Sequence, residues 1–268
     1  MKLFKKKPTI NILRLSGVIS NSSKKDLSLK NLLSRIDKAF TKKSPKAVVL
    51  LIDCPGGSPV QSELISSYLI HSSKKHNIPL ISFVEDVAAS GGYWLACSAK
   101  EIYACSNSSI IGSIGVISAS FGFDELINKI GIKRRVYTAG NSKSVLDPFL
   151  PEKESDVARL NKLLEQVHIN FKNYIKQQRG GKLTGTEEEL FNGNFWVAQE
   201  ALTLGLIDGI ADYFSFLKER YGENTNFNYI EEKSSSLKNL LSNLNINFKL
   251  NNIESLLLKS FSQKPNFL

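Results

Sequence analysis

The serine best suited to chemistry is Ser90, which lies in the stretch Val87–Tyr93 (Val-Ala-Ala-Ser-Gly-Gly-Tyr). Small residues on both sides of a serine permit a sharp turn between a strand and a helix, which exposes the hydroxyl to a substrate. The N–H of Gly91 would then point to the place where an oxyanion forms, and the helix dipole would favour negative charge there. The stretch departs from a strict Gly-x-Ser-x-Gly pattern because Ala88 replaces the first glycine. The simpler interpretation is a serine that only caps the helix.

Two further loops contain residues that could take part in such chemistry. The turn Asp53–Gly57 (Asp-Cys-Pro-Gly-Gly) follows an apolar run, and its glycines would leave backbone N–H groups free to bind a phosphate or a developing oxyanion. A simple turn would have the same composition. The loop Tyr137–Phe149 carries Lys143 among small neighbours. Taken alone, this residue has the features of an ordinary solvated lysine.

The elements that must position these loops alternate along the chain. Ala47–Ile52 is a short continuous apolar run, which is typical of a strand buried on both faces. Ser58 is expected to cap the helix that follows it, and Gly180 to end a long helix that starts near Pro151. The alternation predicts an α/β fold with a largely parallel sheet and right-handed crossovers. The predicted strands are Ile10–Ile19, Ala47–Ile52, Pro79–Val84, Glu101–Ala104, Gly115–Ser118 and Lys133–Tyr137. The predicted helices are Asp26–Phe40, Ser58–His76, Phe123–Ile130, Pro151–Arg179 and Ala198–Leu204, with Ala89–Ser98 as a turn leading into a helix and Thr186–Asn192 as a polar connection.

Composition divides the 268 residues into three predicted segments. Residues 1–9 form a basic N-terminal segment, residues 10–230 a catalytic domain, and residues 231–268 a tail rich in leucine, asparagine and serine. Leucines in the tail have helical spacing, so we expect it to pack on the body or on a neighbouring protomer. A helix lying on a membrane surface is the alternative.

Charge, cysteine and histidine content exclude several classes of function. The net charge is +10, but no block of Lys and Arg is long, which favours a generally basic surface over a nucleic-acid site. Three cysteines without metal-like spacing indicate a reducing compartment or unreactive thiols rather than a set of disulfides. Three scattered histidines do not form a zinc site, and we expect neither a metal nor a cofactor. We find neither an apolar run of about 18–20 residues nor the clean apolar core of a signal peptide. The prediction is a cytoplasmic protein, with at most a peripheral contact at the inner membrane.

Several separated motifs, in order, resemble the signal peptide peptidase A family, the serine peptidases of family S49. The family's Ser-Pro-Gly-Gly-like turn corresponds to Cys54–Gly57, so the first position differs. Its Ala-Ala-Ser-Gly-Gly-Tyr corresponds to Ala88–Tyr93, and its Gly-Ser-apolar-Gly-Val to Gly112–Val116. A Gly-x-x-Lys-Ser-like loop leading to Pro-Phe corresponds to Gly140–Phe149, and Ala198–Asp208 is similar to the closing helix.

The resemblance implies a Clp/crotonase-like fold of stacked β/α units and a Ser–Lys dyad. Carried over position by position, Ser90 is the nucleophile, Lys143 the general base and Ser113 the residue that holds the lysine amine, while Gly57 and Gly91 form the oxyanion hole. The expected substrates are extended peptides, such as remnant signal peptides or membrane-protein fragments. A ring-like homo-oligomer is also implied, in which the serine of one protomer meets the lysine of its neighbour.

The distribution of histidines agrees with a lysine base. None lies between Asn77 and Val167, the stretch that carries the catalytic loops, so a Ser–His–Asp triad is not expected. A lysine with the ordinary pKa of about 10.4 is neutral in only about one molecule in 2,500 at pH 7. A lysine base therefore requires a cleft that removes it from water.

Two alternatives share the same fold. A crotonase-type acyl-CoA enzyme would use the paired oxyanion N–H groups without a nucleophilic serine, and Glu85 and Asp86 are the nearest candidates for its base. We expect these two to be loop carboxylates instead. A catalytically inactive scaffold is the second alternative.

Overall fold

The computed structural model of the protein describes residues 7–140 and 143–231. In it, the apolar run Ala47–Ile52 belongs to strand β2 (Ala47–Cys54), near the centre of the sheet. Packing divides the chain into the units Met1–Ile230 and Glu231–Leu268, and every element below belongs to the first. The predicted helices of the tail lie outside the described residues. The other strands are β1 (Thr9–Ser16), β3 (Leu80–Ala89), β4 (Glu101–Ala104), β5 (Ile110–Gly112), β6 (Phe195–Val197), β7 (Gly209–Ile210) and β8 (Asn226–Tyr229). The helices are α1 (Leu29–Thr41), α2 (Pro59–His76), α3 (Gly91–Ala96), α4 (Asp124–Lys129), α5 (Glu154–Arg179), the 3-10 turn η1 (Gly180–Lys182), α6 (Glu187–Leu190), α7 (Ala198–Thr203) and α8 (Tyr213–Tyr221).

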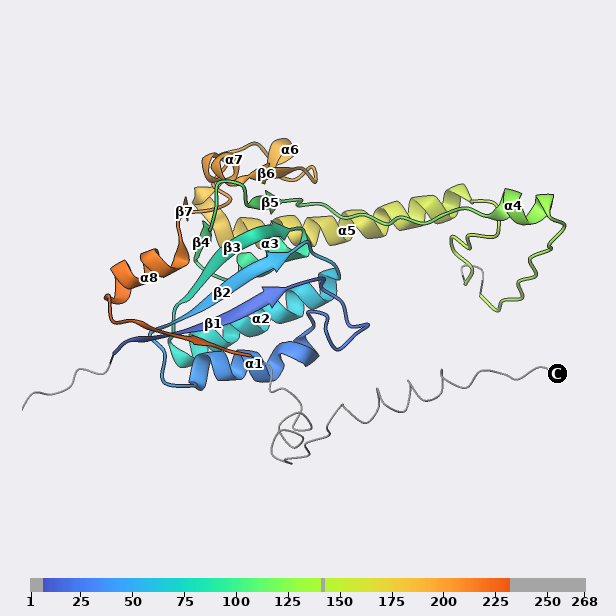
Figure 1. Ribbon diagram of the computed structural model, residues 1–268. Helices are drawn as coiled ribbons and strands as arrows, with labels where there is room; N and C mark the ends of the chain where they lie inside the picture. Colours follow the sequence, from blue (N-terminus) through green and yellow to red (C-terminus); the bar gives the residue numbers. More distant parts are fainter. Residues whose placement is uncertain (1–6, 141–142, 232–268) are drawn as a thin grey trace, which may run out of the picture. The chain divides into compact units, whose positions relative to one another are not determined.

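The sheet confirms the predicted α/β class (Figure 1). Its strand order is β6-β5-β3-β2-β1-β8, with β4 paired to both β3 and β7. Every pair is parallel except β5 with β6, which is antiparallel. A largely parallel sheet needs crossovers, and α1 and α2 supply the first two.

Strand β3 changes partner along its length. Its first half, Ile81–Val84, pairs with β4, whereas its last residues, Val87–Ala89, pair with β5. The end of β3 therefore lies beside the end of β5. This places the residues that follow the two strands, Ser90 and Ser113, at the same edge of the sheet.

Alternate residues of β2 enter two different cores, as expected for a strand buried on both faces. Val48 and Leu50 belong to the cluster that also contains the apolar faces of α1, α2, α3 and α5. Val49 and Leu51 belong to a second cluster that contains Leu217 of α8. Each of these four residues is at most 2% exposed, so packing on both faces holds the strand in place.

The capping predictions are confirmed where they concern α2 and the end of α5. The Ser58 side chain accepts a hydrogen bond from the N–H of Gln61, and Pro59 occupies the first turn. Gly180 follows the last residue of α5 with φ of +50°, a conformation that glycine adopts at low cost.

Several predicted boundaries were wrong for local reasons. Gly115–Ser118 and Lys133–Tyr137 are not strands, because neither segment pairs with another strand in the described part of the chain. Helix α5 begins at Glu154 rather than near Pro151, with acidic Glu154 and Asp156 in its first turn. The supposed polar connection contains α6, which Thr186 caps by accepting from the N–H of Glu189. Within residues 7–140 and 143–231, no helix is both long and apolar enough to cross a membrane.

Candidate active site

Ser90 occupies a strained turn between β3 and α3. Its backbone angles are φ +52° and ψ −122°, which are rare for any residue other than glycine. Its N–H donates to the carbonyl of Gly112 at 2.8 Å, which ties the turn to β5. Its side chain makes no capping hydrogen bond to α3, although it stands at the N-cap position. The hydroxyl is therefore free for another role, and simple helix capping does not account for it.

The turn Gly56–Gly57 lies against Ser90. A Cβ atom added at Gly56 would lie 2.8 Å from the Cβ of Ser90, so only glycine fits there without displacement. A Cβ atom added at Gly91 would lie 3.4 Å from the nitrogen of Gly57, and one added at Gly56 would lie 2.9 Å from the nitrogen of Gly91, so the backbones of these glycines lie close together beside Ser90. Among the described residues, neither N–H donates to a carbonyl. Two adjacent free N–H groups beside a serine hydroxyl can stabilise an oxyanion.

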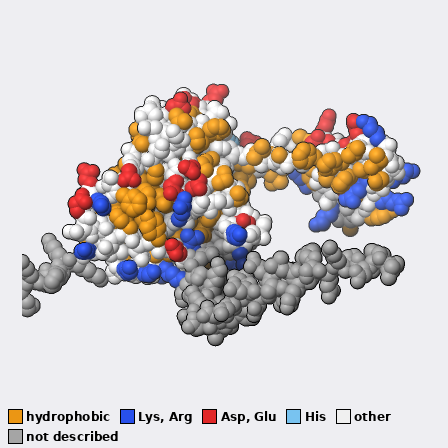
Figure 2. All heavy atoms as spheres, viewed as in Figure 1, with side chains coloured by type: hydrophobic (Ala, Val, Ile, Leu, Met, Phe, Trp, Pro, Cys, Tyr) orange, Lys and Arg blue, Asp and Glu red, His pale blue; other side chains and the backbone are white. Residues whose placement is uncertain are grey.

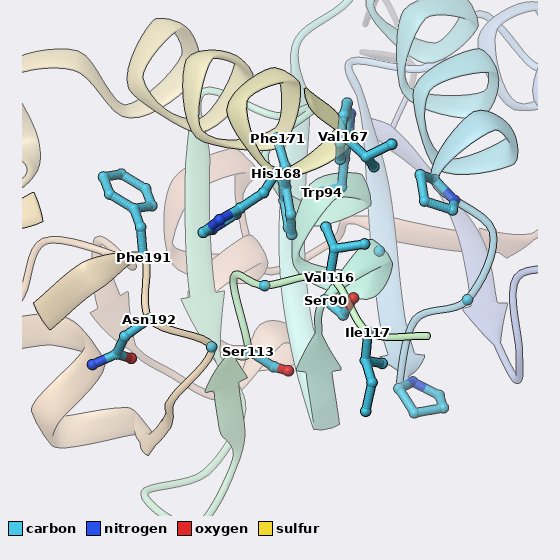
Figure 3. A pocket seen from close by; sticks show the side chains of 16 residues that line it. Ser90, Trp94, Ser113, Val116, Ile117, Val167, His168, Phe171, Phe191 and Asn192 are labelled. Atoms are coloured by element: carbon cyan, nitrogen blue, oxygen red, sulfur yellow. The ribbon is translucent and has the colours of Figure 1, made fainter. Parts of the chain in front are cut away.

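A pocket of about 760 Å³ opens beside these groups (Figure 3). Ser90 and Ser113 come from the ends of neighbouring strands, and Figure 3 shows both in the same hollow. Much of the wall is apolar. The lining residues are Pro55, Gly57, Pro59, Ser90, Gly91, Trp94, Ser113, Gly115, Val116, Ile117, Val167, His168, Phe171, Phe191, Asn192 and Gly193.

Ser113 follows β5 in a second strained turn. Its φ is +53°, and the preceding Gly112 has φ +118°. Its N–H donates to the carbonyl of Asn194 at 2.6 Å, and its own carbonyl accepts from the N–H of Gly115 at 2.9 Å. The pocket therefore contains two serines whose backbones adopt conformations that most residues avoid, which is typical of functional sites.

Lys143 is not among the residues that line the pocket. It is exposed, and it belongs to the segment 121–150, which also contains α4. Within the described residues, every hydrogen bond, ion pair and ring contact of this segment joins two of its own members, such as Arg134 with Asp147. Of the five predicted site residues, the structure brings together Ser90, Gly57, Gly91 and Ser113, and it leaves Lys143 apart.

Exposed hydrophobic side chains gather on residues 117–149 (Figure 2). Ile117 is 86% exposed, Phe121 78% and Tyr137 90%. A protein surface rarely presents so many large apolar groups together unless another molecule covers them. The other exposed members are Phe123, Leu126, Ile130, Ile132 and Phe149.

Three other reactive groups, those of Cys54, Glu85 and Asp86, lie near the site but are poorly placed or poorly ionised for catalysis. Cys54, at the position where the resemblance leads us to expect serine, is buried, and this burial raises the pKa of its thiol to about 11, so it stays protonated at neutral pH. Glu85 and Asp86 lie in strand β3 rather than in a loop, which corrects the prediction. Neither lines the pocket, and a carboxylate oxygen of Glu85 lies 2.7 Å from Arg14.

The pocket also contains residues that sequence reasoning did not select. Trp94 stacks on Phe171 with ring centroids 4.8 Å apart, and His168 and Phe191 complete the wall. Val167, Phe171 and Ile175 recur at the spacing of one helix face, a signal that predicts which side of α5 turns inward. The spacing does not predict that Val167 and Phe171 line the pocket beside Ser90.

A buried ion pair fixes the far end of α5. Arg179 is only 3% exposed and lies 2.7 Å from Asp208, while Lys182 lies 2.6 Å from the other oxygen of the same carboxylate. Burial acts against the charged form, but the hydrogen bonds from Arg179 and Lys182 hold the pKa of Asp208 below its ordinary value. The guanidinium also donates to the carbonyl of Gly205. These contacts hold the helix that supplies the pocket wall.

Comparisons with known proteins give a consistent family. Residues 72–220 match the profile of peptidase family S49. The chain is 30% identical over 263 residues to a protein of Buchnera aphidicola named "Probable protease SohB", covering 97% of this chain and 72% of that protein. Among solved structures, a "membrane-bound stomatin-specific protease" has a TM-score of 0.52 at 16% identity, covering 85% of this chain and 99% of that one, which shows the shared fold.

A relative with higher identity is much longer than this chain. The chain is 46% identical over 231 residues to a Brucella melitensis protein named "Na(+)/H(+) antiporter NhaA", covering 85% of this chain. The match spans only 31% of that protein. That name therefore carries no activity over to the matched part.

Proposed function

The chain belongs to peptidase family S49, and on that premise we propose that it is a serine endopeptidase in which Ser90 attacks the peptide bond and Lys143 is the general base. The observation that carries the proposal is the backbone of Ser90 at φ +52° beside the paired N–H groups of Gly57 and Gly91. A nucleophile on a strained turn next to two free N–H groups is the arrangement that acyl transfer requires.

The proposed reaction has two acyl-transfer steps. The neutral amine of Lys143 takes the proton of the Ser90 hydroxyl as the oxygen attacks the carbonyl carbon. The N–H groups of Gly57 and Gly91 stabilise the negative charge on the carbonyl oxygen. The protonated amine then gives its proton to the nitrogen of the peptide bond as the C–N bond breaks. The amine half of the peptide departs, and the acyl half remains as an ester on Ser90. Water, deprotonated by the same amine, hydrolyses the ester and regenerates the serine.

The Ser113 hydroxyl is proposed to hold the amine of Lys143. A hydroxyl both donates and accepts, so it can accept from the amine without adding a charge to the site. Its place in the pocket with Ser90 supports this role.

The substrates are proposed to be extended peptides with apolar side chains, which includes remnant signal peptides and fragments of membrane proteins. Trp94, Val116 and Phe171 supply apolar surface to the pocket, and burial of apolar surface gives affinity. A peptide library should therefore be cleaved after small or aliphatic residues. A cleavage profile dominated by Asp, Glu, Lys or Arg at that position would contradict the proposed substrate class.

We propose that two protomers share each site. Lys143 is exposed and absent from the lining of its own chain's pocket, and the segment that carries it presents uncovered apolar side chains. A neighbouring protomer that covered this segment would bury its apolar surface and bring Lys143 to a second Ser90. It would also remove the amine from water, which the neutral form requires.

Labelling with a fluorophosphonate probe tests the activity. The purified protein should be labelled at Ser90, Ser90→Ala should lose the label, and the exposed control Ser120→Ala should keep it. A crotonase-type enzyme or an inactive scaffold would not be labelled at Ser90, so an unlabelled wild-type protein would reject the proposal.

A further inference from the structure

His168 is the pocket residue whose role the proposed dyad leaves open. It lies on the inward face of α5, beside Val167 and Phe171, and it lines the pocket that contains Ser90. Figure 3 shows its ring reaching from α5 toward the segment that carries Ser113. A histidine in a pocket with a candidate nucleophile is first of all a candidate base, so its hydrogen bond decides what it can do.

The ring is bound to a backbone carbonyl. Its Nε2 atom lies 3.1 Å from the carbonyl oxygen of Ile114. A carbonyl oxygen can only accept, so Nε2 must carry the proton. This hydrogen bond forms with the neutral ring and with the protonated ring alike, and it occupies the nitrogen that points toward the turn.

Ile114 lies at the centre of a tight backbone turn in the pocket. The residue before it, Ser113, has φ +53°, and the N–H of the residue after it, Gly115, bonds back to the carbonyl of Ser113 at 2.9 Å. Gly112, at the start of the turn, accepts from the N–H of Ser90. The turn from Gly112 to Gly115 is thus joined directly to the nucleophile.

Besides the N–H of Ser90, two further groups among the described residues form hydrogen bonds to this turn. The loop before β6 contributes the carbonyl of Asn194, which accepts from the N–H of Ser113. On the other side, His168 donates to the carbonyl of Ile114. The bond from Asn194 fixes the entry to the turn, whereas the bond from His168 fixes its centre and ties it to the long helix.

We infer that His168 is a positioning residue that locks the Gly112–Gly115 turn and so aims the Ser113 hydroxyl at the place where the lysine amine must lie. It acts through Ser113 and takes no proton from the substrate or from Ser90. The inference rests on the proposed Ser–Lys activity for its catalytic consequence. The lock itself is a property of the fold and can be measured without any substrate.

Two variants separate positioning from base catalysis. His168→Gln keeps an N–H donor near the position of Nε2 but cannot titrate, whereas His168→Phe fills similar space without a donor. We expect His168→Phe to lower kcat by about 10- to 100-fold, as a small misplacement of a catalytic group does, with KM little changed. His168→Gln should stay near the wild-type rate with the same pH profile.

A double-mutant comparison tests whether the effect runs through Ser113. If it does, adding His168→Phe to Ser113→Ala should lower kcat little further, because the group that the histidine positions is already gone. If the fold-losses in kcat of the two single variants multiply in the double variant, His168 acts independently of Ser113, and the inference is overturned.

Hydrogen exchange gives the readout that needs no activity. Backbone amides in residues 110–117 should exchange faster in His168→Phe than in wild type or His168→Gln, with exchange in β1 and β2 unchanged as the check on folding. Unchanged exchange in His168→Phe would overturn the inference. So would a His168→Gln variant as impaired as His168→Phe, since the ring itself would then be required. If the wild-type protein neither cleaves peptides nor reacts with the fluorophosphonate probe at Ser90, the proposed function fails. The hydrogen-exchange result still shows, independently, whether His168 holds the Gly112–Gly115 turn.

Discussion

Ser90 and Lys143 lie in regions built in contrasting ways. Around Ser90, strand β2 and the first half of β3 (residues 80–84) are buried, and the backbones of Gly56, Gly57 and Gly91 lie close to one another. Around Lys143, the hydrogen bonds, ion pairs and ring contacts of the described residues in the segment 121–150 all lie within that segment, and Phe121 and Tyr137 are largely exposed. The surroundings of the proposed nucleophile are formed within one chain, whereas the proposed base lies on an exposed segment.

This contrast agrees with the chemistry that we propose for each side. An oxyanion hole works because its N–H groups are already aligned, which only a rigid backbone provides. A lysine base works because it is removed from water, which any well-packed surface provides, including that of a second protomer. The predictions below test whether the two regions differ in these ways.

The largest expected effect is on activity when either member of the dyad is removed. Ser90→Ala and Lys143→Ala should each abolish cleavage without unfolding the protein, and the double variant should be no worse than either, because the two act as a unit. The measurement is peptide cleavage together with circular dichroism. Cleavage at the wild-type rate in Lys143→Ala would contradict the assignment of the base.

Mixing the two inactive variants tests the sharing of sites between protomers. If one chain supplies Ser90 and its neighbour Lys143, reassembled mixtures should regain part of the wild-type activity. Mass spectrometry must first show that subunits have exchanged. No recovery in exchanged mixtures would mean that each dyad forms within one chain.

Alanine at glycine positions compares the rigidity of the two regions. Gly57 has φ +140°, and a Cβ there would collide with the carbonyl of Ile19, so Gly57→Ala should displace one oxyanion donor. We expect a loss of about 10²- to 10³-fold in kcat, the usual effect of losing such a donor. The control is Gly131→Ala, at φ +75° with no atom within 4 Å of the added Cβ, which should leave kcat nearly unchanged. Equal losses in the two variants would remove the distinction between the regions.

Neutralising one partly buried carboxylate outside the segment 121–150 and one exposed carboxylate within it compares how each part of the chain depends on its charges. Asp208→Asn leaves the buried guanidinium of Arg179 without its charged partner, which typically costs about 3–5 kcal/mol of unfolding free energy. Glu125→Gln in α4 breaks only an exposed pair with Lys129 and should change stability little. Urea unfolding at pH 7 measures both. A Glu125→Gln effect as large as that of Asp208→Asn would show that α4 is as tightly integrated as the body.

Acid should reduce the contribution of Asp208 in a defined direction. Its folded pKa lies below its ordinary value, so its charged form binds better in the native state. The stability it contributes is complete above the unfolded pKa of about 3.9 and is lost as pH falls through the folded pKa. The difference in melting temperature between wild type and Asp208→Asn should therefore shrink below about pH 4. A constant difference from pH 7 to pH 3 would show that the carboxylate's charge is not what stabilises the protein.

The sequence by itself predicted the class of fold and the turn that carries Ser90, the proposed nucleophile. The continuous apolar run at β2 and the small residues around Ser90 are local patterns, and local backbone preferences are sufficient to read them. The cap at Ser58 and the helix end at Gly180 are predictable for the same reason. Sequence patterns could also indicate which face of α5 turns inward.

Only the tertiary structure decided what meets at the site. The change of partner along β3, from β4 to β5, brings Gly112 beside Ser90. Helix α5 brings His168 to Ile114, which is 54 positions away in the chain. The segments 115–118 and 133–137 have strand-like composition, yet neither pairs in the described structure, because a strand requires a partner that composition does not specify. The separation of Lys143 from Ser90 is likewise a property of packing, because spacing along a chain does not specify which distant surfaces come together.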